Sequence, residues 1–167
     1  MNLHVGYRPG CIGRIVEMHA NYYAKTVGFG APFEAKVAAE LAEFIRHYVP
    51  ERDGLWLADD GDTVHGSIVI DGAHSEESGA HLRWFITSDA VRGTGMGSRL
   101  LGAAMDFCRA SDYRRVYLWT FDELHVARHL YEKHGFTLTR TQRGSQWGKE
   151  VNEQLFTLGD IGTVRAR

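Results

Sequence analysis

The sequence has little of what marks disulfide-rich, membrane or nucleic-acid-binding proteins. Only 2 of its 167 residues are cysteine, too few for a disulfide framework or a cysteine-rich metal site. No stretch approaches the ~20 apolar residues that span a bilayer, and Arg8 and Pro9 interrupt the region where a signal peptide would be apolar. The formal net charge is −2, which indicates no basic surface for nucleic acid or anionic lipid. We therefore expect a cytoplasmic protein without nucleic-acid or membrane partners.

What is present is the composition of an ordinary folded domain. The apolar share of 44% and the charged share of 24% are typical of globular proteins. A chain of 167 residues is long enough for one substantial core, and it contains no repeats or low-complexity segments. We expect a single domain over residues 1–167, as a monomer or a homodimer. Cys108 falls on an apolar helix face, where it is expected to be a small core residue.

Three of the 19 glycines, Gly93, Gly95 and Gly97, alternate with other residues between a predicted strand and a predicted helix. The strand, 81–87, is rich in aromatic and β-branched residues. The helix is indicated by apolar residues at helical spacing: Met96, Leu100, Leu101, Ala104, Met105 and Cys108. Glycine lets a ligand approach the backbone closely, and a helix start offers unpaired N–H groups. Because Arg92 adds positive charge, this loop is predicted to bind phosphate or pyrophosphate.

Two common phosphate-binding loops fit this spacing poorly. No Lys-Ser or Lys-Thr pair closes the loop, so it is not the P-loop of nucleotide-binding proteins. The third position of the dinucleotide fingerprint prefers Gly or Ala, and here it is Ser98. A dinucleotide-binding oxidoreductase would also need this loop after its first strand and an acidic residue ending the next strand. Several predicted strands precede the loop, and Asp122 lies too far along the chain.

The run 92–97, Arg-Gly-Thr-Gly-Met-Gly, resembles the Arg-x-x-Gly-x-Gly/Ala motif of the GNAT superfamily, the acyl-CoA-dependent N-acetyltransferases. A second segment, 127–136, reads Ala-Arg-His-Leu-Tyr-Glu-Lys-His-Gly-Phe and is similar to the family's Ala-x-x-Leu-Tyr-x-Lys-x-Gly-Phe block. The two motifs stand in the family's order and at its spacing. Less specific matches at His19, Tyr23 and 33–34 resemble the acetyltransferase half of bacterial proteins that fuse a MarR-type DNA-binding domain to a GNAT domain.

The order of predicted elements also matches the GNAT fold, an α/β (α+β) architecture. We expect a strand, two helices, three strands, a helix, a strand, a helix and two strands. The predicted ranges are 5–7, 12–28, 33–48, 55–58, 63–70, 81–87, 96–110, 115–120, 127–134, a strand from 136, and 154–158. The resemblance implies a mixed, mostly antiparallel central sheet of about six to seven strands. About four helices flank it, and a splayed strand pair lies at the cofactor site.

The resemblance implies that acetyl-CoA is the co-substrate. The backbone of strand 81–87 would pair with its pantetheine arm, and an N–H there would polarise the thioester carbonyl. Family members often carry an Asn where this chain has Leu124, so that contact is missing or comes from Asp122. The expected cofactor-binding residues are Phe85, Ile86, Thr87, Arg92, Gly93, Thr94, Gly95, Met96, Gly97, Ser98, Asp122, Ala127 and Tyr131.

Tyr131 matches the family tyrosine that donates a proton to the departing thiolate of CoA. A phenol is neutral at pH 7 and can hydrogen-bond the negative charge that develops on sulfur. The alternative is that Tyr131 is only a core aromatic on an amphipathic helix.

The general base is predicted less specifically, with His81 and His19 as the catalytic candidates. His81 lies six residues before Thr87, where many family members place a carboxylate or a histidine. Strand alternation would put His81, Arg83, Phe85 and Thr87 on one face, provided that no bulge intervenes. A histidine with a pKa near 6.5 suits deprotonation of an ammonium. His19, with Tyr23 and Glu17 on the same helix, competes for the role, and each has an ordinary reading as a solvated or hydrogen-bonded residue.

The acceptor is expected to be a small-molecule amine. Tyr22, Tyr23, Arg83 and Trp84 suggest a substrate-binding pocket with aromatic walls and one positive charge, which could orient an acceptor that carries a carboxylate. The alternative is that Arg83 pairs with a carboxylate within the fold. The loop 144–148 would also contribute to specificity. No histidines or acids show metal-ligand spacing, so no metal is expected. We expect direct transfer of acetyl from acetyl-CoA to a primary amine in a ternary complex; the alternative is a non-catalytic acyl-CoA sensor or interaction domain on the same fold.

Overall fold

The computed structural model describes residues 1–159 and 161. This part of the chain contains four helices and seven strands, which follow one another in the predicted order. None of the helices in this part of the chain combines the length and apolar character needed to cross a membrane. The elements are β1 (Asn2–Val5), α1 (Cys11–Val27), α2 (Ala31–Arg46), β2 (Gly54–Asp59), β3 (Val64–Asp71), β4 (Ala80–Thr87), α3 (Met96–Ala110), β5 (Arg115–Phe121), α4 (His125–Lys133), β6 (Thr137–Gly144) and β7 (Val151–Gly159).

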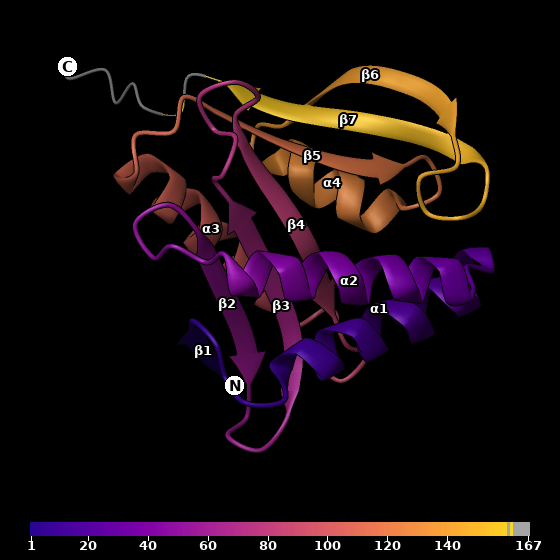
Figure 1. Ribbon diagram of the computed structural model, residues 1–167, viewed down its shortest axis with the longest axis horizontal. Coiled ribbons are helices and arrows are strands. Elements are labelled where there is room, and N and C mark those ends of the chain that lie inside the picture. Colours follow the sequence, from indigo (N-terminus) through magenta and orange to yellow (C-terminus); the bar gives the residue numbers. More distant parts are fainter. Residues whose placement is uncertain (160, 162–167) are drawn as a thin grey trace.

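All seven strands form one twisted sheet in the order β1-β2-β3-β4-β5-β7-β6. Every neighbouring pair is antiparallel except β4 and β5, which run parallel. Helices α1 and α2 cover one face of the sheet, and α3 and α4 lie on the other (Figure 1). Each layer of helices buries its apolar stripe against the sheet, which gives two hydrophobic cores. The predicted GNAT architecture is confirmed.

The first strand differs from its prediction. It covers Asn2–Val5 rather than 5–7, and Gly6 follows it with a φ of 89°. The left-handed backbone at Gly6 ends the extended segment, and its N–H donates to the Leu55 carbonyl at 2.8 Å. Tyr7 is exposed, so the apparent apolar alternation at 5–7 did not report a buried face.

The parallel strands β4 and β5 separate soon after they meet. They pair only at Ala80 with Val116 and at His81 with Tyr117. Beyond residue 81 the two strands diverge, and α1 and α2 cross in front of the opening (Figure 1). The rest of β4 therefore has an edge without a β5 partner, where backbone N–H and C=O groups can bind a ligand instead. The predicted splayed strand pair is confirmed.

A β-bulge interrupts β4 within this opening. Val69 pairs with Arg83 and Ser67 pairs with Ile86, so β4 has one more residue than β3 between these positions. Trp84 adopts a φ of 46° there, which for a bulky residue carries strain of about 1–3 kcal/mol. The buried Ser67 hydroxyl donates to the Trp84 carbonyl at 2.7 Å and holds this conformation.

The bulge changes which side chains share a face of β4. Trp84 and Ile86 pack into the core beneath α1 and α2, whereas Phe85 packs against the core beneath α3. A side chain at position 97 in α3 would meet Phe85 and Thr87, so both point toward that helix. The prediction that His81, Arg83, Phe85 and Thr87 share one face is therefore wrong beyond Arg83, because the extra residue reverses the alternation.

Candidate active site

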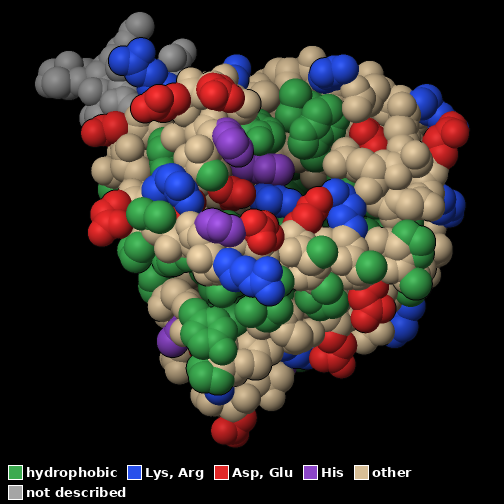
Figure 2. All heavy atoms as spheres, viewed as in Figure 1, with side chains coloured by type: hydrophobic (Ala, Val, Ile, Leu, Met, Phe, Trp, Pro, Cys, Tyr) green, Lys and Arg blue, Asp and Glu red, His purple; other side chains and the backbone are tan. Residues whose placement is uncertain are grey.

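A cavity of about 350 Å³ occupies the opening between β4 and β5. Its lining comes from both faces of the sheet. Helices α1 and α2 contribute His19, Tyr23, Lys36 and Glu40 from one side, and α4 contributes Tyr131 from the other. Figure 2 shows basic, acidic and histidine side chains gathered around a hollow on the face that carries α1 and α2. The opening thus joins the region behind the sheet to the region under α1 and α2.

The glycine loop lies between β4 and α3. Gly95 is the N-cap of α3, with a φ of 86°, and Gly93 has a φ of 78°. A Cβ at either position would meet no atom within 4 Å, so packing does not demand glycine there. The reason is the positive φ, together with open space in which a ligand can approach the backbone. These observations fit a group that binds through backbone N–H donors.

The beginning of α3 supplies those donors. Its first intrahelical hydrogen bond runs from the Arg99 N–H to the Gly95 carbonyl at 3.1 Å, so the N–H groups of Met96, Gly97 and Ser98 precede the helical ladder. The first turn contains no acidic residue, and no side chain caps the helix. The Arg92 guanidinium lies beside the loop, where it donates to the Thr87 carbonyl at 2.9 Å and pairs with Asp89. An anion would find a positive helix end here.

Two loop residues already have partners of their own. The Thr94 hydroxyl donates to the Val91 carbonyl at 2.6 Å, within the loop itself. The Arg92 side chain also lies over the Tyr22 ring, with 4.9 Å between the guanidinium carbon and the ring centroid. Tyr22 therefore contacts the glycine loop and does not line the cavity, although it was predicted to bind the acceptor substrate.

Tyr131 lies on α4 at the α3–α4 side of the opening. Its ring packs between Phe85, Phe136 and Phe156, with centroid separations of 6.0 to 6.2 Å. Burial raises the pKa of its phenol well above the ordinary value, so the hydroxyl stays protonated over the physiological range. The ring is part of the core and also lines the cavity, so its packing is compatible with both sequence interpretations, and the proton-donor role stays a prediction.

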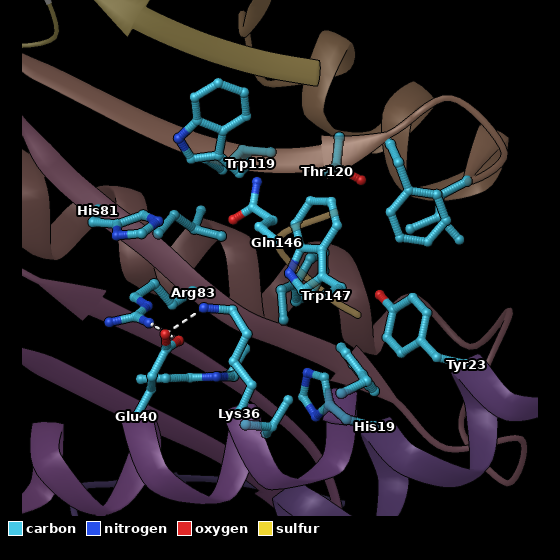
Figure 3. Close-up of a pocket in the computed structure, with 18 of the residues that line it drawn as sticks. His19, Tyr23, Lys36, Glu40, His81, Arg83, Trp119, Thr120, Gln146 and Trp147 are labelled. Atoms are coloured by element: carbon cyan, nitrogen blue, oxygen red, sulfur yellow. Dashed lines mark hydrogen bonds and ion pairs between the residues drawn. The ribbon is translucent and has the colours of Figure 1, made fainter. Parts of the chain in front are cut away.

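His19 projects from α1 into the cavity (Figure 3). Its Nδ1 lies 2.8 Å from the Ile15 carbonyl. A carbonyl can only accept, so the neutral ring carries its proton on Nδ1 and leaves Nε2 as an acceptor. Burial lowers the pKa of His19 to about 4, despite the opposing effect of this hydrogen bond. At neutral pH, His19 can accept a hydrogen bond from an amine but has little affinity for a proton.

His81 lines the same cavity from β4 and stacks on Tyr117, with 4.4 Å between the ring centroids. Burial, together with the positive charges of Arg83 and Lys36, lowers its pKa to about 3. The expectation of a pKa near 6.5 is wrong for this reason. His81 is at the predicted place, but it is a weaker base than the sequence suggested.

Arg83 lines the cavity but is already paired. Its Nη2 lies 2.6 Å from the Glu40 carboxylate, and its Nη1 lies 3.4 Å from Asp71. Its guanidinium carbon lies 4.1 Å from the centre of the Trp84 ring. The sequence left open whether Arg83 offers a free positive charge or pairs with a carboxylate of the fold, and the structure pairs it with acidic residues of α2 and β3.

The opposite wall of the cavity is aromatic. Tyr23 packs edge-to-face against Phe33 at 5.1 Å, and Phe121 lies 5.5 Å from Trp147. Trp147 comes from the β6–β7 loop, which is held against α1 because Lys149 Nζ donates to the Val27 carbonyl at 2.7 Å. The Tyr23 hydroxyl points toward the cavity (Figure 3), and burial raises its pKa above the ordinary value.

Like Tyr22, Ile86, Thr87 and the glycine loop, three residues considered from the sequence on α1, after β5 and on α4 lie outside the cavity lining. Asp122 accepts a hydrogen bond from Asn152 Nδ2 at 2.7 Å, which ties the end of β5 to β7. Ala127 packs against both cores from the first turn of α4. Glu17 is exposed and pairs with Arg14 at 2.9 Å. Leu124, at the position where the family often has Asn, does line the cavity and supplies only apolar surface.

Sequence reasoning missed two charged residues of the cavity, Lys36 and Glu40. They lie four residues apart on α2 and form an ion pair. The spacing could have predicted the pair, but an exposed helix face explains such a pair equally well. No signal in the sequence indicated that this face of α2 lies over the opening in the sheet. Within the described part of the chain, no three His, Cys, Asp or Glu residues are arranged to hold a metal ion.

The split between the parallel strands β4 and β5, the bulge before the glycine loop and the buried tyrosine on α4 are together typical of one class of acyltransferase fold. Residues 16–136 match the model of the Acetyltransferase (GNAT) family. The chain belongs to this family, and the acetyl-CoA-dependent chemistry expected from the two motifs agrees with it.

Particular relatives show how far the likeness extends. A mycothiol acetyltransferase from Cellulomonas flavigena is 39% identical over 90 residues, which are 53% of this chain and 26% of the relative. The match thus covers about a quarter of that protein. Among solved structures, yncA from Salmonella typhimurium, solved with its cofactor acetyl-CoA, is 15% identical with a TM-score of 0.69, covering 100% of this chain and 98% of the other. A spermidine N-acetyltransferase variant from Vibrio cholerae is 17% identical with a TM-score of 0.71, covering 99% and 98%.

Proposed function

We propose that this protein transfers the acetyl group of acetyl-CoA to a primary amine of a small molecule, by direct attack in a ternary complex. The observation that carries the proposal is the single cavity in the β4–β5 opening. It joins Tyr131 on one side of the sheet to His19, Lys36 and Glu40 on the other. A thioester and an amine could therefore meet inside one space that the sheet itself surrounds.

Backbone groups would hold the co-substrate. The N–H groups of Met96, Gly97 and Ser98 precede the helical ladder of α3, and open space lies beside Gly93 and Gly95, so this helix start suits the pyrophosphate. The unpaired β4 edge suits the pantetheine arm, and an N–H near the bulge would stabilise negative charge on the carbonyl oxygen. Acetyl-CoA, when bound, supplies an activated acetyl thioester.

Direct transfer is favoured because the chain offers no cysteine to carry the acetyl group. Cys11 and Cys108 are the chain's 2 cysteines, and both are fully buried within the cores. Burial raises the pKa of Cys108 to about 12, so its thiol stays protonated. The amine would therefore attack the thioester itself.

Proton transfers would use both sides of the cavity. His19 Nε2 can accept a hydrogen bond from the attacking amine and orient it. With pKa values of about 4 and about 3, His19 and His81 are poorly matched to take a proton from an alkylammonium, whose pKa is about 10. We therefore assign the removal of that proton to water in the cavity. Tyr131, protonated at neutral pH, is assigned as the donor to the leaving thiolate.

The test is a titration of the protein with acetyl-CoA by calorimetry, followed by a panel of primary amines with release of free thiol as the readout. We expect saturable binding and amine-dependent thiol release. Absence of acetyl-CoA binding contradicts the proposal. Binding without thiol release for any amine favours the alternative, a non-catalytic acyl-CoA sensor.

The relatives' named acceptors are not carried over to this chain. The mycothiol acetyltransferase is matched over only 26% of its length, and the likeness to the spermidine enzyme concerns the fold. We further propose that residues 1–167 act as one domain in the reducing cytoplasm, as a monomer or homodimer. Light scattering and fractionation of cells test this. The likeness to MarR–GNAT fusions stays a prediction.

A further inference from the structure

Three charged side chains meet on the α2 side of the cavity (Figure 3). The Glu40 carboxylate lies between Arg83 and Lys36: its Oε2 accepts from Arg83 Nη2 at 2.6 Å, and its Oε1 accepts from Lys36 Nζ. Asp71, the other partner of Arg83, is not part of the lining. Two cations therefore face the cavity with only one carboxylate between them.

The remaining titratable groups of the lining add no compensating charge at neutral pH. His19 and His81 are neutral because their pKa values are lowered to about 4 and about 3. Tyr23 and Tyr131 are neutral because burial raises their pKa values. Among the lining residues the formal charges therefore sum to +1, while Asp71, outside the lining, also pairs with Arg83. Arg83, two residues from His81 on β4, and Lys36 also help to lower the pKa of His81.

The two cations also have donors to spare, in fixed positions. A guanidinium has five N–H donors and an ammonium has three, and Glu40 and Asp71 together use only some of them. Stacking on Trp84 fixes the plane of the Arg83 guanidinium, and its side chain is 20% exposed. A second oxyanion can therefore bind without rearrangement of Arg83.

We propose that the acceptor is an amine that also carries a carboxylate, such as a free amino acid, and that Lys36 and Arg83 bind this carboxylate. The inference rests on the proposed acetyltransferase function and specifies its substrate class. The aromatic wall of Phe33 and Trp147 receives an apolar side chain of the acceptor. Since the cavity of about 350 Å³ is at the small end of ligand pockets, it suits a single amino acid rather than a folded protein.

The same arrangement disfavours a polyamine. A polyamine would bring several positive charges against Lys36 and Arg83, and Glu40, the lining's only carboxylate, is already shared by both. Nearby cations also lower the pKa of an ammonium, as they do for His81. A positive pocket therefore increases the neutral, reactive fraction of an acceptor that its carboxylate holds in place.

The test compares matched acceptors on protein saturated with CoA, by calorimetry at pH 7. Each pair consists of a free amino acid and its amide: phenylalanine, leucine and glutamine. We expect at least one free acid to bind about 10-fold more tightly than its amide, because only the acid offers a charged acceptor. The proposal is overturned if no pair favours the acid, or if spermidine binds more tightly than every acid. If the protein binds CoA but does not prefer acids, only the proposed acceptor class is contradicted. If the protein does not bind CoA, the proposed acetyltransferase function is contradicted.

Two substitutions on α2 make the test more specific, because they are expected to change the affinity for free acids in opposite directions. Lys36→Met should weaken acid binding about 5- to 10-fold, and Glu40→Gln should strengthen it by removing the competing carboxylate, while the amides change little. A merely structural role would move acid and amide together. The reverse pattern, with Glu40→Gln weakening the acceptor, would mean that Glu40 binds its ammonium and would overturn the proposal. Lys25→Met on the exposed end of α1 is the matched control.

Discussion

The two halves of the proposed site differ in the groups that would bind. On the proposed co-substrate side these groups are backbone: the glycine loop and the start of α3, which lie outside the cavity lining, and the free edge of β4. On the acceptor side they are side chains from four separate elements: His19 from α1, Lys36 and Glu40 from α2, Arg83 from β4 and Trp147 from the β6–β7 loop. The backbone half needs only local sequence to form. The side-chain half exists only after α1 and α2 have packed over the sheet.

The comparison teaches that the two halves should fail in different ways. A backbone site is damaged by a residue that cannot adopt its φ or that fills the space of the ligand. A buried side-chain site is damaged by a change of charge, because burial makes charged histidines costly. Four predictions test this difference.

The largest effect is expected from Gly95→Val at the N-cap of α3. We expect acetyl-CoA affinity to fall about 100-fold, because the valine side chain occupies the space in front of the N–H donors. The matched control is Gly10→Val, at the N-cap of α1. Gly10 has a φ of 87°, and a Cβ there also meets nothing within 4 Å, so both variants carry the same strain of about 1–2 kcal/mol. Equal acetyl-CoA affinity in the two variants by calorimetry would show that the loop is not the binding site.

The second effect concerns stability and the acceptor half. The folded pKa of His19 is about 4, below its unfolded value of about 6.5, so the unfolded chain binds more protons between these limits. The free energy of unfolding should therefore fall as the pH drops through this window, with about 2 kcal/mol lost to His19 by pH 5. Urea titrations at pH 7 and pH 5 should show a smaller acid loss in His19→Gln. An identical acid loss in parent and variant would contradict burial of a neutral His19.

The third effect is on turnover. Tyr131→Phe keeps the ring and its packing, so we expect unchanged thermal stability and unchanged acetyl-CoA affinity. We expect kcat to fall by about 10-fold or more. Tyr117→Phe is the control, because it removes the same hydroxyl from a half-buried tyrosine of β5 that lies outside the cavity lining. If chemistry limits the rate and Tyr131→Phe turns over like the parent, Tyr131 has no part in proton transfer.

The smallest effect is expected from His81→Gln in the pH profile of kcat/KM for the best amine. Because the pKa of His81 is lowered to about 3, neither parent nor variant should show a limb near pH 6.5 that belongs to this residue. A limb near pH 6.5 in the parent that disappears in His81→Gln would restore His81 as a general base.

Sequence reasoning predicted the geometry of the backbone half almost completely. Glycine spacing, a preceding strand and a following helix are local patterns, and the resemblance to the GNAT family then implied the splayed strands. Tyr131 was found because a ten-residue block around it matched the family. Only the first strand was displaced, because Gly6 ends the extended segment earlier than the apolar pattern suggested.

The side-chain half could be predicted only in part. His19, His81 and Arg83 were named, but their properties depend on partners that no spacing reveals. Arg83 is paired with Glu40, 43 residues away, and the pKa of His81 depends on burial beneath α2. The bulge at Trp84 also has no sequence signal, because tryptophan is a residue that ordinarily favours regular strands.

The bulge in β4 has a consequence for engineering this protein. Upstream of it, His81 and Arg83 line the cavity on the proposed acceptor side, and downstream of it Phe85 and Thr87 point toward α3. The strand is therefore two independent modules joined at Trp84, whose carbonyl Ser67 holds from the neighbouring strand. Under the proposed function, substitutions at 81–83 should change acceptor preference and leave the residues after the bulge in place. A one-residue deletion at Trp84 would restore regular pairing with β3 while Phe85, Ile86 and Thr87 kept their faces, so it would remove the contact with Ser67 and test what the bulge itself contributes.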